Sequence, residues 1–352
     1  MSSEMITTAR HFLLSGGGTL GSVMPLLALV EQARNEGRPW RFTWIGTASG
    51  PEKNEVERYA IPFYCIINGK WRRYFSWRNL LTPLFVLLAF IQSFMVLARL
   101  RPDVVITAGG FVGVPLAWAA WCYRLPVVVH EQDVQRGLAS RLVAPFATLR
   151  TVIWPGDSGT VAVGNLIRPS VYRGDTTSLR RRWPESAGLP ILLALGGGTG
   201  AIGLNNLIAA AAPALTVHAF IVHITGYGKE VVVALPRYVQ LPFLADDFAD
   251  IFTAADLVIT RAGMGTLSEL ATLRKAIIAV PMPNSHQERN AAALSVAGAA
   301  VVLNQSSLTA ISLAATVADL LADTNRRQVL GEALYRLIPD GTAKFIQRVA
   351  LI

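Results

Sequence analysis

The chain has 352 residues, which favours two domains, and 52% of them are hydrophobic, enough for two packed cores. This composition excludes an intrinsically disordered chain, and the two cysteines, Cys65 and Cys122, exclude a disulfide framework or a cysteine-based zinc cluster. The net charge of +9 suits an anionic partner such as nucleic acid, an acidic lipid surface or a phosphorylated substrate.

The first half of the chain alternates short apolar runs with segments typical of helices. The strand "HFLLS" leads into the glycine loop "GGGTLGSV" and then into a helix that Gly37 closes. Continuous Val, Ile and Leu runs of this kind predict parallel strands that are buried on both faces. Further strands are expected at 41–47, 61–67, 102–110, 126–132, 151–156 and 160–165, with a helix at 114–124.

The second half repeats this arrangement. "PILLALGGGTG" is again a strand that ends on glycines, and a helix follows it at 204–215. The predicted fold class is therefore α/β, with two doubly wound parallel-sheet halves. They join near residues 165–190, where the composition shifts. Strands are expected at 218–226, 238–244, 256–263, 276–283 and 299–304, and helices at 265–274 and 286–298.

Glycine loops follow three of the predicted strands, at 16–21, 196–200 and 260–266. Glycines let the backbone approach a ligand, and the helix that follows points free N–H groups at it, which suits a phosphate. The alternative is that the glycines only make tight strand-to-helix turns. Because two halves carry the same loop, a shared diphosphate or sugar site is the better interpretation. In the third loop, Glu269 either accepts two ribose hydroxyls or serves only as a helix-dipole partner.

The segment 79–100 is apolar and nearly long enough to span a membrane. Pro83 lies near its start, Gln92 and Ser93 interrupt its middle, and an alternating αβ pattern surrounds it. These features favour a buried or membrane-touching helix. The apolar run near the N-terminus is too short for a signal peptide.

Taken in their order and spacing, the motifs resemble those of the MurG family, bacterial glycosyltransferases that make lipid II. The resemblance implies the GT-B fold, with two Rossmann-like doubly wound parallel-sheet domains facing a cleft. It also implies inverting, metal-independent transfer of N-acetylglucosamine from UDP-GlcNAc to lipid I, an undecaprenyl-diphospho-muramoyl-pentapeptide, with no cofactor. The motifs that carry it are "GGGTLGSVMPLLAL", "PDVVITAGGFVGVPLAWAAW", "PVVVHEQD", "GNLIRPSV", "LALGGGTGAIGLN", "TRAGMGTLSELATL" and "VPMPNSHQERNA".

The resemblance further implies three parts of the chain. Residues 1–165 form an N-terminal domain that binds the acceptor and associates with the membrane. Residues 166–335 form the UDP-GlcNAc-binding domain, and residues 336–352 form a C-terminal helix that packs back on the N-terminal domain.

Family roles transfer to matching positions. Arg168 matches a donor-contacting arginine, Gly198 replaces a serine at the diphosphate, and Leu244 lies near the uracil-contacting backbone. Glu269 is expected to take the ribose hydroxyls. The other implied substrate contacts are Thr19, Leu20 and Gly21 in the first loop, Met264, Gly265, Thr266, Leu267 and Ser268 in the donor loop, and Gln287 and Asn290 at the sugar.

Two departures from the family pattern bear on catalysis. Ser22 stands where the family's first loop has a histidine, and serine cannot act as a base near neutral pH. Asp133 stands where the family's "HEQN" has an asparagine whose amide contacts the donor sugar, so the resemblance implies a substrate contact at Asp133. One hypothesis is that Asp133 or Glu131 supplies the base that Ser22 cannot. The alternative is that the strand-end residues His130 and Glu131 are structural and that activity is low or altered.

A basic aromatic stretch precedes the apolar segment and matches the family's membrane-association patch. Cations and aromatic rings suit the headgroup level of an anionic membrane, whereas a solvated basic loop is the alternative. The expected location is peripheral, on the cytoplasmic face of the cell membrane. The patch comprises Trp71, Arg72, Arg73, Tyr74, Phe75, Trp77 and Arg78.

The expected partners are thus UDP-GlcNAc, lipid I and an anionic membrane surface, with other cell-wall synthesis proteins as further candidates. Nucleic acid is not expected, because the basic residues sit beside a long apolar run. Two alternatives stay open: a GT-B glycosyltransferase with another lipid acceptor, and a catalytically silent UDP-sugar-binding homologue.

Overall fold

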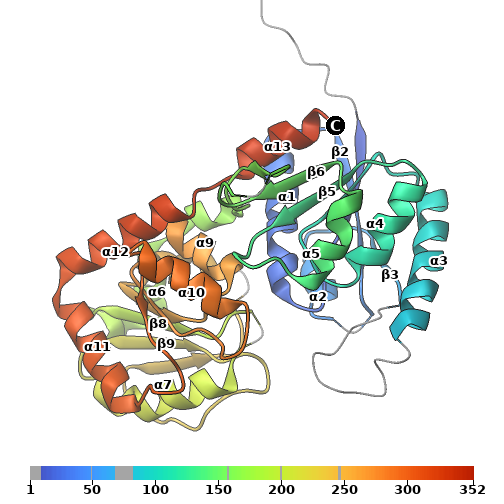
Figure 1. Ribbon diagram of the computed structural model, residues 1–352. Helices are drawn as coiled ribbons and strands as arrows, with labels where there is room; N and C mark the ends of the chain where they lie inside the picture. The colour runs from blue at the N-terminus through green and yellow to red at the C-terminus, as the bar shows by residue number, and fades with distance from the viewer. Residues whose placement is uncertain (1–8, 49, 68–81, 157, 199, 245–246) are drawn as a thin grey trace, which may run out of the picture. The chain divides into compact units, whose positions relative to one another are not determined.

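The computed structural model describes residues 9–48, 50–67, 82–156, 158–198, 200–244 and 247–352 (Figure 1). The chain divides into two compact units. The first unit comprises Met1–Gln132, Arg136–Arg168 and Asp340–Ile352, and the second comprises Asp133–Gln135 and Pro169–Pro339.

Within the described residues, the first unit contains a seven-stranded, entirely parallel sheet in the order β3-β2-β1-β4-β5-β6-β7. Its central strands are buried along their whole length because helices cover both faces (Figure 1). The strands are β1 (Arg10–Ser15), β2 (Trp40–Gly46), β3 (Phe63–Cys65), β4 (Val104–Thr107), β5 (Val127–Glu131), β6 (Leu149–Val152) and β7 (Val161–Ala162).

Alternate residues of these strands pack on different helices. Leu13 and Val105 belong to a core that includes residues of α3, α4 and α5. The neighbouring positions point to the opposite face, where the His130 ring lies 5.6 Å from that of Phe345 in α13. The helices of this unit are α1 (Met24–Asn35), α2 (Glu52–Arg58), α3 (Thr82–Leu100), α4 (Gly113–Cys122), α5 (Leu138–Val143) and α13 (Thr342–Ala350).

Helix α3 is apolar on two sides. Ala89, Ser93 and Leu97 are buried at helical spacing, and the helix packs against α4. Ser93, which interrupts the apolar run, donates its hydroxyl to the Ala89 carbonyl (2.7 Å). Among the described residues, the window Pro83–Leu100 is long and apolar enough to cross a membrane, and 17% of it is buried. The basic aromatic patch at 71–78 lies outside the described residues.

The second unit contains, within the described residues, a six-stranded parallel sheet in the order β10-β9-β8-β11-β12-β13. Its strands are β8 (Ile191–Leu195), β9 (Phe220–Ile224), β10 (Tyr238–Leu241), β11 (Leu257–Thr260), β12 (Ile277–Ala279) and β13 (Val301–Val302). Its helices are α6 (Thr176–Arg182), α7 (Ile202–Leu215), α8 (Phe248–Ala254), α9 (Met264–Thr272), α10 (Gln287–Val296), α11 (Ala310–Ala322) and α12 (Thr324–Leu337).

Each sheet has one point where the strand order reverses, between β1 and β4 in the first unit and between β8 and β11 in the second. The connections that follow these strands leave in opposite directions, which makes room for a ligand at the carboxyl edge. Three predicted glycine loops follow β1, β8 and β11, at these reversal points. The predicted fold class, two doubly wound parallel-sheet domains, is confirmed.

The segment expected to join the domains is largely folded. The unit boundary falls between Arg168 and Pro169, and the residues that follow belong to the second unit. Helix α6 packs on α8, and the Asp175 backbone N–H donates to the Asp250 carboxylate (2.7 Å). The composition shift at 165–190 therefore reflects an exposed, arginine-rich helix.

Two buried histidines predict how stability depends on pH. Burial lowers the pKa of both His130, in the first unit, and His223, in the second, to about 4. In the unfolded chain a histidine takes up a proton near pH 6.5, so below that value the unfolded state gains protons that the folded state excludes. The stabilisation is thus complete above about pH 6.5 and is lost as the pH falls toward 4.

Between pH 7.5 and 5 we expect the free energy of unfolding to fall by roughly 2 kcal/mol for each histidine. The loss begins near pH 6.5 and amounts to about 1.4 kcal/mol for each pH unit below that value. Urea unfolding at the two pH values measures this. The variant His223→Gln should lose the second unit's share of the pH dependence, because glutamine does not titrate. An unchanged pH dependence in that variant would contradict the assignment.

Candidate active site

Ser22 is part of the first glycine loop itself. This side chain is 8% exposed, and its hydroxyl oxygen accepts from the Gly17 N–H (3.1 Å) while donating to the Thr19 carbonyl (3.4 Å). A Cβ on Gly16 would lie 2.4 Å from the Ser22 carbonyl oxygen, so the loop folds tightly onto this residue. Ser22 therefore holds the loop. Thr19 and Gly21 remain exposed on it, whereas Leu20 is buried.

A buried carboxylate supports the same loop. Glu52 is fully buried and accepts from the backbone N–H groups of Gly18 (3.1 Å) and Thr47 (2.8 Å). The Thr47 hydroxyl donates to it as well. Sequence reasoning missed Glu52, because it lies in α2, several residues beyond the end of β2. Its position shows that the first loop is fixed from two sides.

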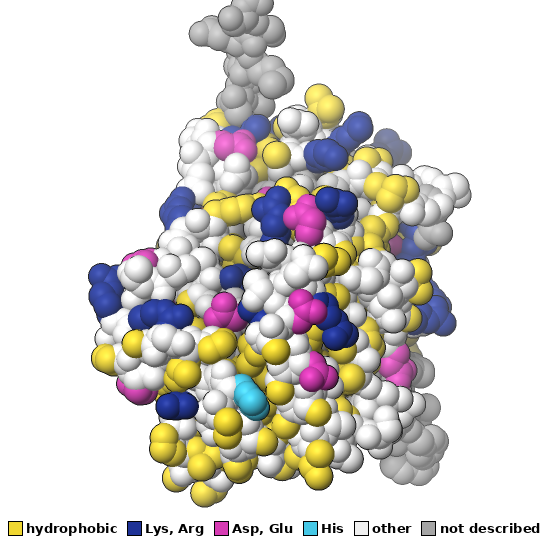
Figure 2. Space-filling view, turned by 90° about the vertical axis from the view of Figure 1, so that its left-hand side faces the viewer, with side chains coloured by type: hydrophobic (Ala, Val, Ile, Leu, Met, Phe, Trp, Pro, Cys, Tyr) yellow, Lys and Arg dark blue, Asp and Glu magenta, His cyan; other side chains and the backbone are white. Residues whose placement is uncertain are grey.

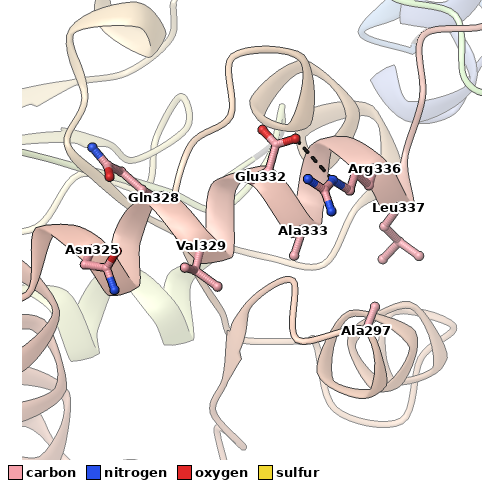
Figure 3. Close-up of a pocket in the computed structure, with 8 residues that line it drawn as sticks. All are labelled: Ala297, Asn325, Gln328, Val329, Glu332, Ala333, Arg336 and Leu337. Carbon is pink, nitrogen blue, oxygen red and sulfur yellow. Dashed lines mark hydrogen bonds and ion pairs between the residues drawn. The ribbon is translucent and has the colours of Figure 1, made fainter.

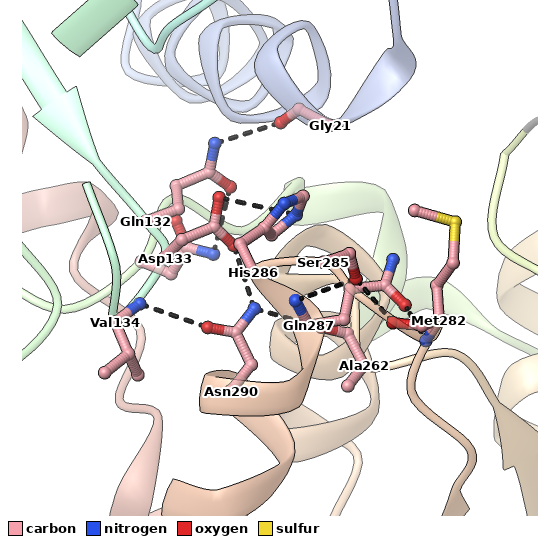
Figure 4. A network of polar contacts seen from close by, with 11 residues as sticks. Gly21, Gln132, Asp133, Val134, Ala262, Met282, Ser285, His286, Gln287 and Asn290 are labelled. Atoms are coloured by element: carbon pink, nitrogen blue, oxygen red, sulfur yellow. Dashed lines mark hydrogen bonds and ion pairs between the residues drawn. The ribbon is translucent and has the colours of Figure 1, made fainter. Parts of the chain in front are cut away.

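Glu131, at the end of β5, is held in a buried ion-pair cluster. Its side chain is 4% exposed and lies 2.7 Å from the Arg136 guanidinium and 3.9 Å from that of Arg150. The next residue, Gln132, donates its amide to the Gly21 carbonyl (2.9 Å), which connects the end of β5 to the first loop (Figure 4). A side chain buried to this extent between two arginines has little surface to present to an acceptor hydroxyl. This arrangement favours Asp133 over Glu131 as the candidate base.

Asp133 lies in a polar network of the second unit (Figure 4). Its Oδ1 accepts from the Asn290 Nδ2 (2.9 Å), and its Oδ2 lies 3.9 Å from the His286 Nε2. The Asp133 and His286 side chains are each 37% exposed, so both can reach solvent or a ligand.

Asn290 organises this network from a buried position. Its side chain is 1% exposed, its Nδ2 also donates to the Ala262 carbonyl (3.0 Å), and its Oδ1 accepts from the Val134 N–H (3.1 Å). These contacts occupy both ends of the amide. Asn290, predicted as a sugar contact, therefore also fixes the position of Asp133.

The loop that follows β11 brings the other predicted donor residues together. Gly263 is the N-cap of α9, so the first N–H groups of α9 face the carboxyl edge of the sheet. Glu269 is 8% exposed in the second turn of this helix, and Ser268 donates its hydroxyl to the Met264 carbonyl (2.7 Å). Leu267 is fully buried. The donor loop is thus the beginning of helix α9.

Neighbouring residues fix the base of this loop. Arg261 is buried and donates to the carbonyls of Val280 (3.0 Å) and Pro281 (3.1 Å), and burial lowers the pKa of its guanidinium. Gln287, at the start of α10, accepts from the Met282 N–H (3.0 Å), and its Nε2 lies beside Gly263. Sequence reasoning singled out Gln287 and missed Arg261.

The other predicted donor residues lie in loops. Gly198 is exposed in the second glycine loop, after β8. Leu244 is half-buried beyond the end of β10, at the same carboxyl edge of the sheet. Arg168 is half-buried and ends the segment Arg136–Arg168 of the first unit.

A separate groove of about 710 Å³ lies along α12 (Figure 3). Ala297, beyond the last residue of α10, lines it, and an ion pair joins Glu332 to Arg336 (3.2 Å). Helix α10 begins at Gln287, beside the donor loop, and ends next to Ala297 in the groove. The length of its 10 residues therefore places the groove about 15 Å from the donor loop. None of the residues predicted from the sequence lines this groove.

On the face that Figure 2 presents, basic and acidic side chains of the described residues are interspersed with neutral ones.

Comparison with known proteins identifies both halves of the chain. The glycosyltransferase family 28 N-terminal domain matches residues 12–151, and the glycosyltransferase family 28 C-terminal domain matches residues 191–335. A solved structure described as Acinetobacter baumannii MurG superposes with a TM-score of 0.73 at 25% identity, covering 97% of this chain and all of that one.

Two relatives carry the same enzyme name, UDP-N-acetylglucosamine–N-acetylmuramyl-(pentapeptide) pyrophosphoryl-undecaprenol N-acetylglucosamine transferase. The protein of Legionella pneumophila (strain Paris) is 35% identical over 324 residues, 88% of each chain. That of Geobacillus thermodenitrificans (strain NG80-2) is 32% identical over 330 residues, 90% of this chain and 92% of the relative. The resemblance found in the motifs is confirmed, and the chain belongs to the MurG family of glycosyltransferases, within glycosyltransferase family 28.

Proposed function

We propose that this chain transfers N-acetylglucosamine from UDP-GlcNAc to lipid I, with inversion at the anomeric carbon, to give lipid II in peptidoglycan synthesis. The supporting observation is that the donor motifs converge on the carboxyl edge of one sheet, in a chain whose relatives of similar length carry that activity in their name. A family member that keeps Arg168, Glu269, Gln287 and Asn290 at the matching positions is expected to use the same donor.

In this proposal the donor diphosphate binds at the second glycine loop and at the N-terminus of α9. Backbone N–H groups and the helix dipole stabilise negative charge there, including the charge that develops on UDP as it leaves. Glu269 accepts the ribose hydroxyls, and Gln287 contacts the sugar. Arg168 remains a predicted donor contact.

Asp133 is the proposed general base. The acceptor hydroxyl oxygen forms a bond to the anomeric carbon, the bond from that carbon to the UDP oxygen breaks, and the hydroxyl proton passes to the Asp133 carboxylate. Asn290 holds Oδ1 of the carboxylate at 2.9 Å, and Oδ2, 3.9 Å from the His286 Nε2, is the oxygen that accepts the proton.

The test is UDP release from UDP-GlcNAc by the purified protein, with and without a lipid I analogue. Release only in the presence of the analogue supports the proposal and shows that the chain tolerates Ser22. Donor binding without release would favour another lipid acceptor or a silent UDP-sugar-binding homologue. UDP release in the presence of a different polyprenyl lipid or a diacylglycerol would show that the chain uses another lipid acceptor.

We further propose that the protein binds the cytoplasmic face of the cell membrane peripherally through α3. One side of this helix packs in the unit, and the other exposes large apolar side chains. An anionic lipid surface fits this face and the net charge of +9. The exposed side comprises Leu84, Phe85, Leu87, Leu88, Ile91, Phe94 and Met95.

The triple variant Leu84→Ser, Leu87→Ser, Ile91→Ser is expected to lower binding to anionic phospholipid vesicles by at least about tenfold, because each apolar side chain contributes on the order of 1.5 kcal/mol or more when buried. Cosedimentation with vesicles measures this. Val296 and Ile311 are highly exposed in the second unit, so Val296→Ser, Ile311→Ser is a matched control that should bind like the wild type. Equal binding by all three proteins would contradict the role of α3.

A further inference from the structure

The turn after β9 carries an ammonium group and an aromatic ring to the second glycine loop. Gly226 and Gly228 adopt left-handed backbone conformations (φ +87° and +67°), which turn the chain sharply at the carboxyl edge of the sheet. A Cβ on Gly200 would lie 2.0 Å from the Thr225 carbonyl oxygen. The backbone of the glycine loop therefore packs directly against this turn.

Lys229 connects the two segments. Its ammonium donates to the Gly200 carbonyl (3.0 Å), and the Asn205 amide donates to the carbonyls of Lys229 (3.0 Å) and Thr225 (2.8 Å). His223 in turn contacts Asn205 (3.2 Å), so buried groups fix the position of the turn. The result is a positive charge held at the loop proposed to bind the diphosphate. The nearest carboxylate on the turn, Glu230, accepts from the Gly228 N–H (3.3 Å).

Tyr227 adds an aromatic surface at the same edge. Its side chain is 73% exposed, and its ring lies 5.8 Å from that of Phe243 at an interplanar angle of 22°. Phe243 follows β10, the strand beside β9. The exposed Tyr227 ring, which lies nearly parallel to the half-buried Phe243 ring, offers a face on which a nucleobase can stack. An ammonium and an aromatic face together suit a nucleoside diphosphate.

We infer that the turn Gly226–Glu230 recognises both parts of the donor nucleotide: Lys229 is a positioning residue that holds the second glycine loop and adds positive charge beside the diphosphate, and Tyr227 stacks on the base. This inference rests on the proposed function, since it assigns further residues to the UDP-GlcNAc site.

The test compares binding of UDP and of uridine by isothermal titration calorimetry. Lys229→Met is expected to lower the affinity for UDP at least about tenfold and to change the affinity for uridine less than about twofold, because only UDP carries the diphosphate. Tyr227→Ala is expected to lower the affinities for UDP and for uridine alike, each by roughly tenfold. Lys229→Arg should restore part of the UDP affinity, and raised salt should narrow the difference between wild type and Lys229→Met.

Lys275→Met is the matched control, because Lys275 lies in the same unit and also donates to a backbone carbonyl, that of Thr253 (2.6 Å). It should bind UDP like the wild type. If Lys229→Met unfolds, Lys229→Arg alone still tests the inference, because a shifted ammonium should alter UDP and not uridine. If the Lys229 variants lose affinity for UDP and uridine equally, or lose none, the role of Lys229 is overturned. Unchanged affinities in Tyr227→Ala overturn the stacking of Tyr227 on the base. Wild-type protein that binds no UDP would overturn the proposed function as well.

Discussion

Replacing Asp133 by asparagine is expected to lower kcat for lipid I glycosylation by about 10²- to 10⁴-fold, the usual contribution of a general base, while leaving KM for UDP-GlcNAc nearly unchanged. Asparagine has the same shape, and its carbonyl oxygen can still accept from the Asn290 amide, so the network should persist. It lacks the carboxylate that takes the proton. Steady-state UDP release measures both constants.

Asp319→Asn is the matched control for this prediction, because Asp319 is exposed on α11 of the same unit. His286→Gln separates the base from its neighbour: at 3.9 Å, the imidazole should modulate kcat only a few-fold. Unchanged turnover by Asp133→Asn would remove Asp133 as the base. Increased turnover would mean that the family's asparagine is the better residue and that Asp133 limits activity.

The strands were predictable because the sheets are buried on both faces. Val127–Val129 and Ile191–Leu195 are continuous apolar runs for that reason, and such runs between helices are typical of parallel sheets covered on both faces. Helices α2 and α6 were not predicted, since both are short and charged, and their burial comes from one or two side chains. Their positions depend on tertiary contacts.

The glycine loops were predictable, whereas the residues that hold them were not. Gly16–Gly21 and Gly196–Gly200 stand out because each follows an apolar run. Glu52 supports the first loop across 34 residues, and Lys229 supports the second across 29. A lone glutamate or lysine in a loop or short helix has no local signature, and only the folded chain brings it to its partner. The same reason explains why Glu131, equal to Asp133 as a base in the sequence, differs from it in the structure.

Replacing Glu269 by glutamine is expected to weaken UDP binding by about 10- to 100-fold, because hydrogen bonds to a charged group contribute about 1.5–3 kcal/mol. Glu269 is 8% exposed, near the start of α9, and in the proposed function its carboxylate accepts the ribose hydroxyls. Titration with UDP and with 2′-deoxyuridine diphosphate measures the effect. Wild-type protein should prefer UDP by roughly tenfold, and Glu269→Gln should lose most of that preference.

The comparison of the two nucleotides decides between the two roles that Glu269 could have. If Glu269 has only a structural or helix-dipole role, the variant should bind both nucleotides more weakly by the same factor. The preference for the nucleotide with the 2′-hydroxyl would then survive in the variant. Glu288→Gln is the matched control, since Glu288 is exposed in the first turn of α10 and should affect neither nucleotide. Thermal unfolding of each variant separates a lost contact from a lost fold. Only direct contact with the 2′-hydroxyl predicts a combined cost little greater than that of Glu269→Gln alone when the hydroxyl is also deleted from the ligand.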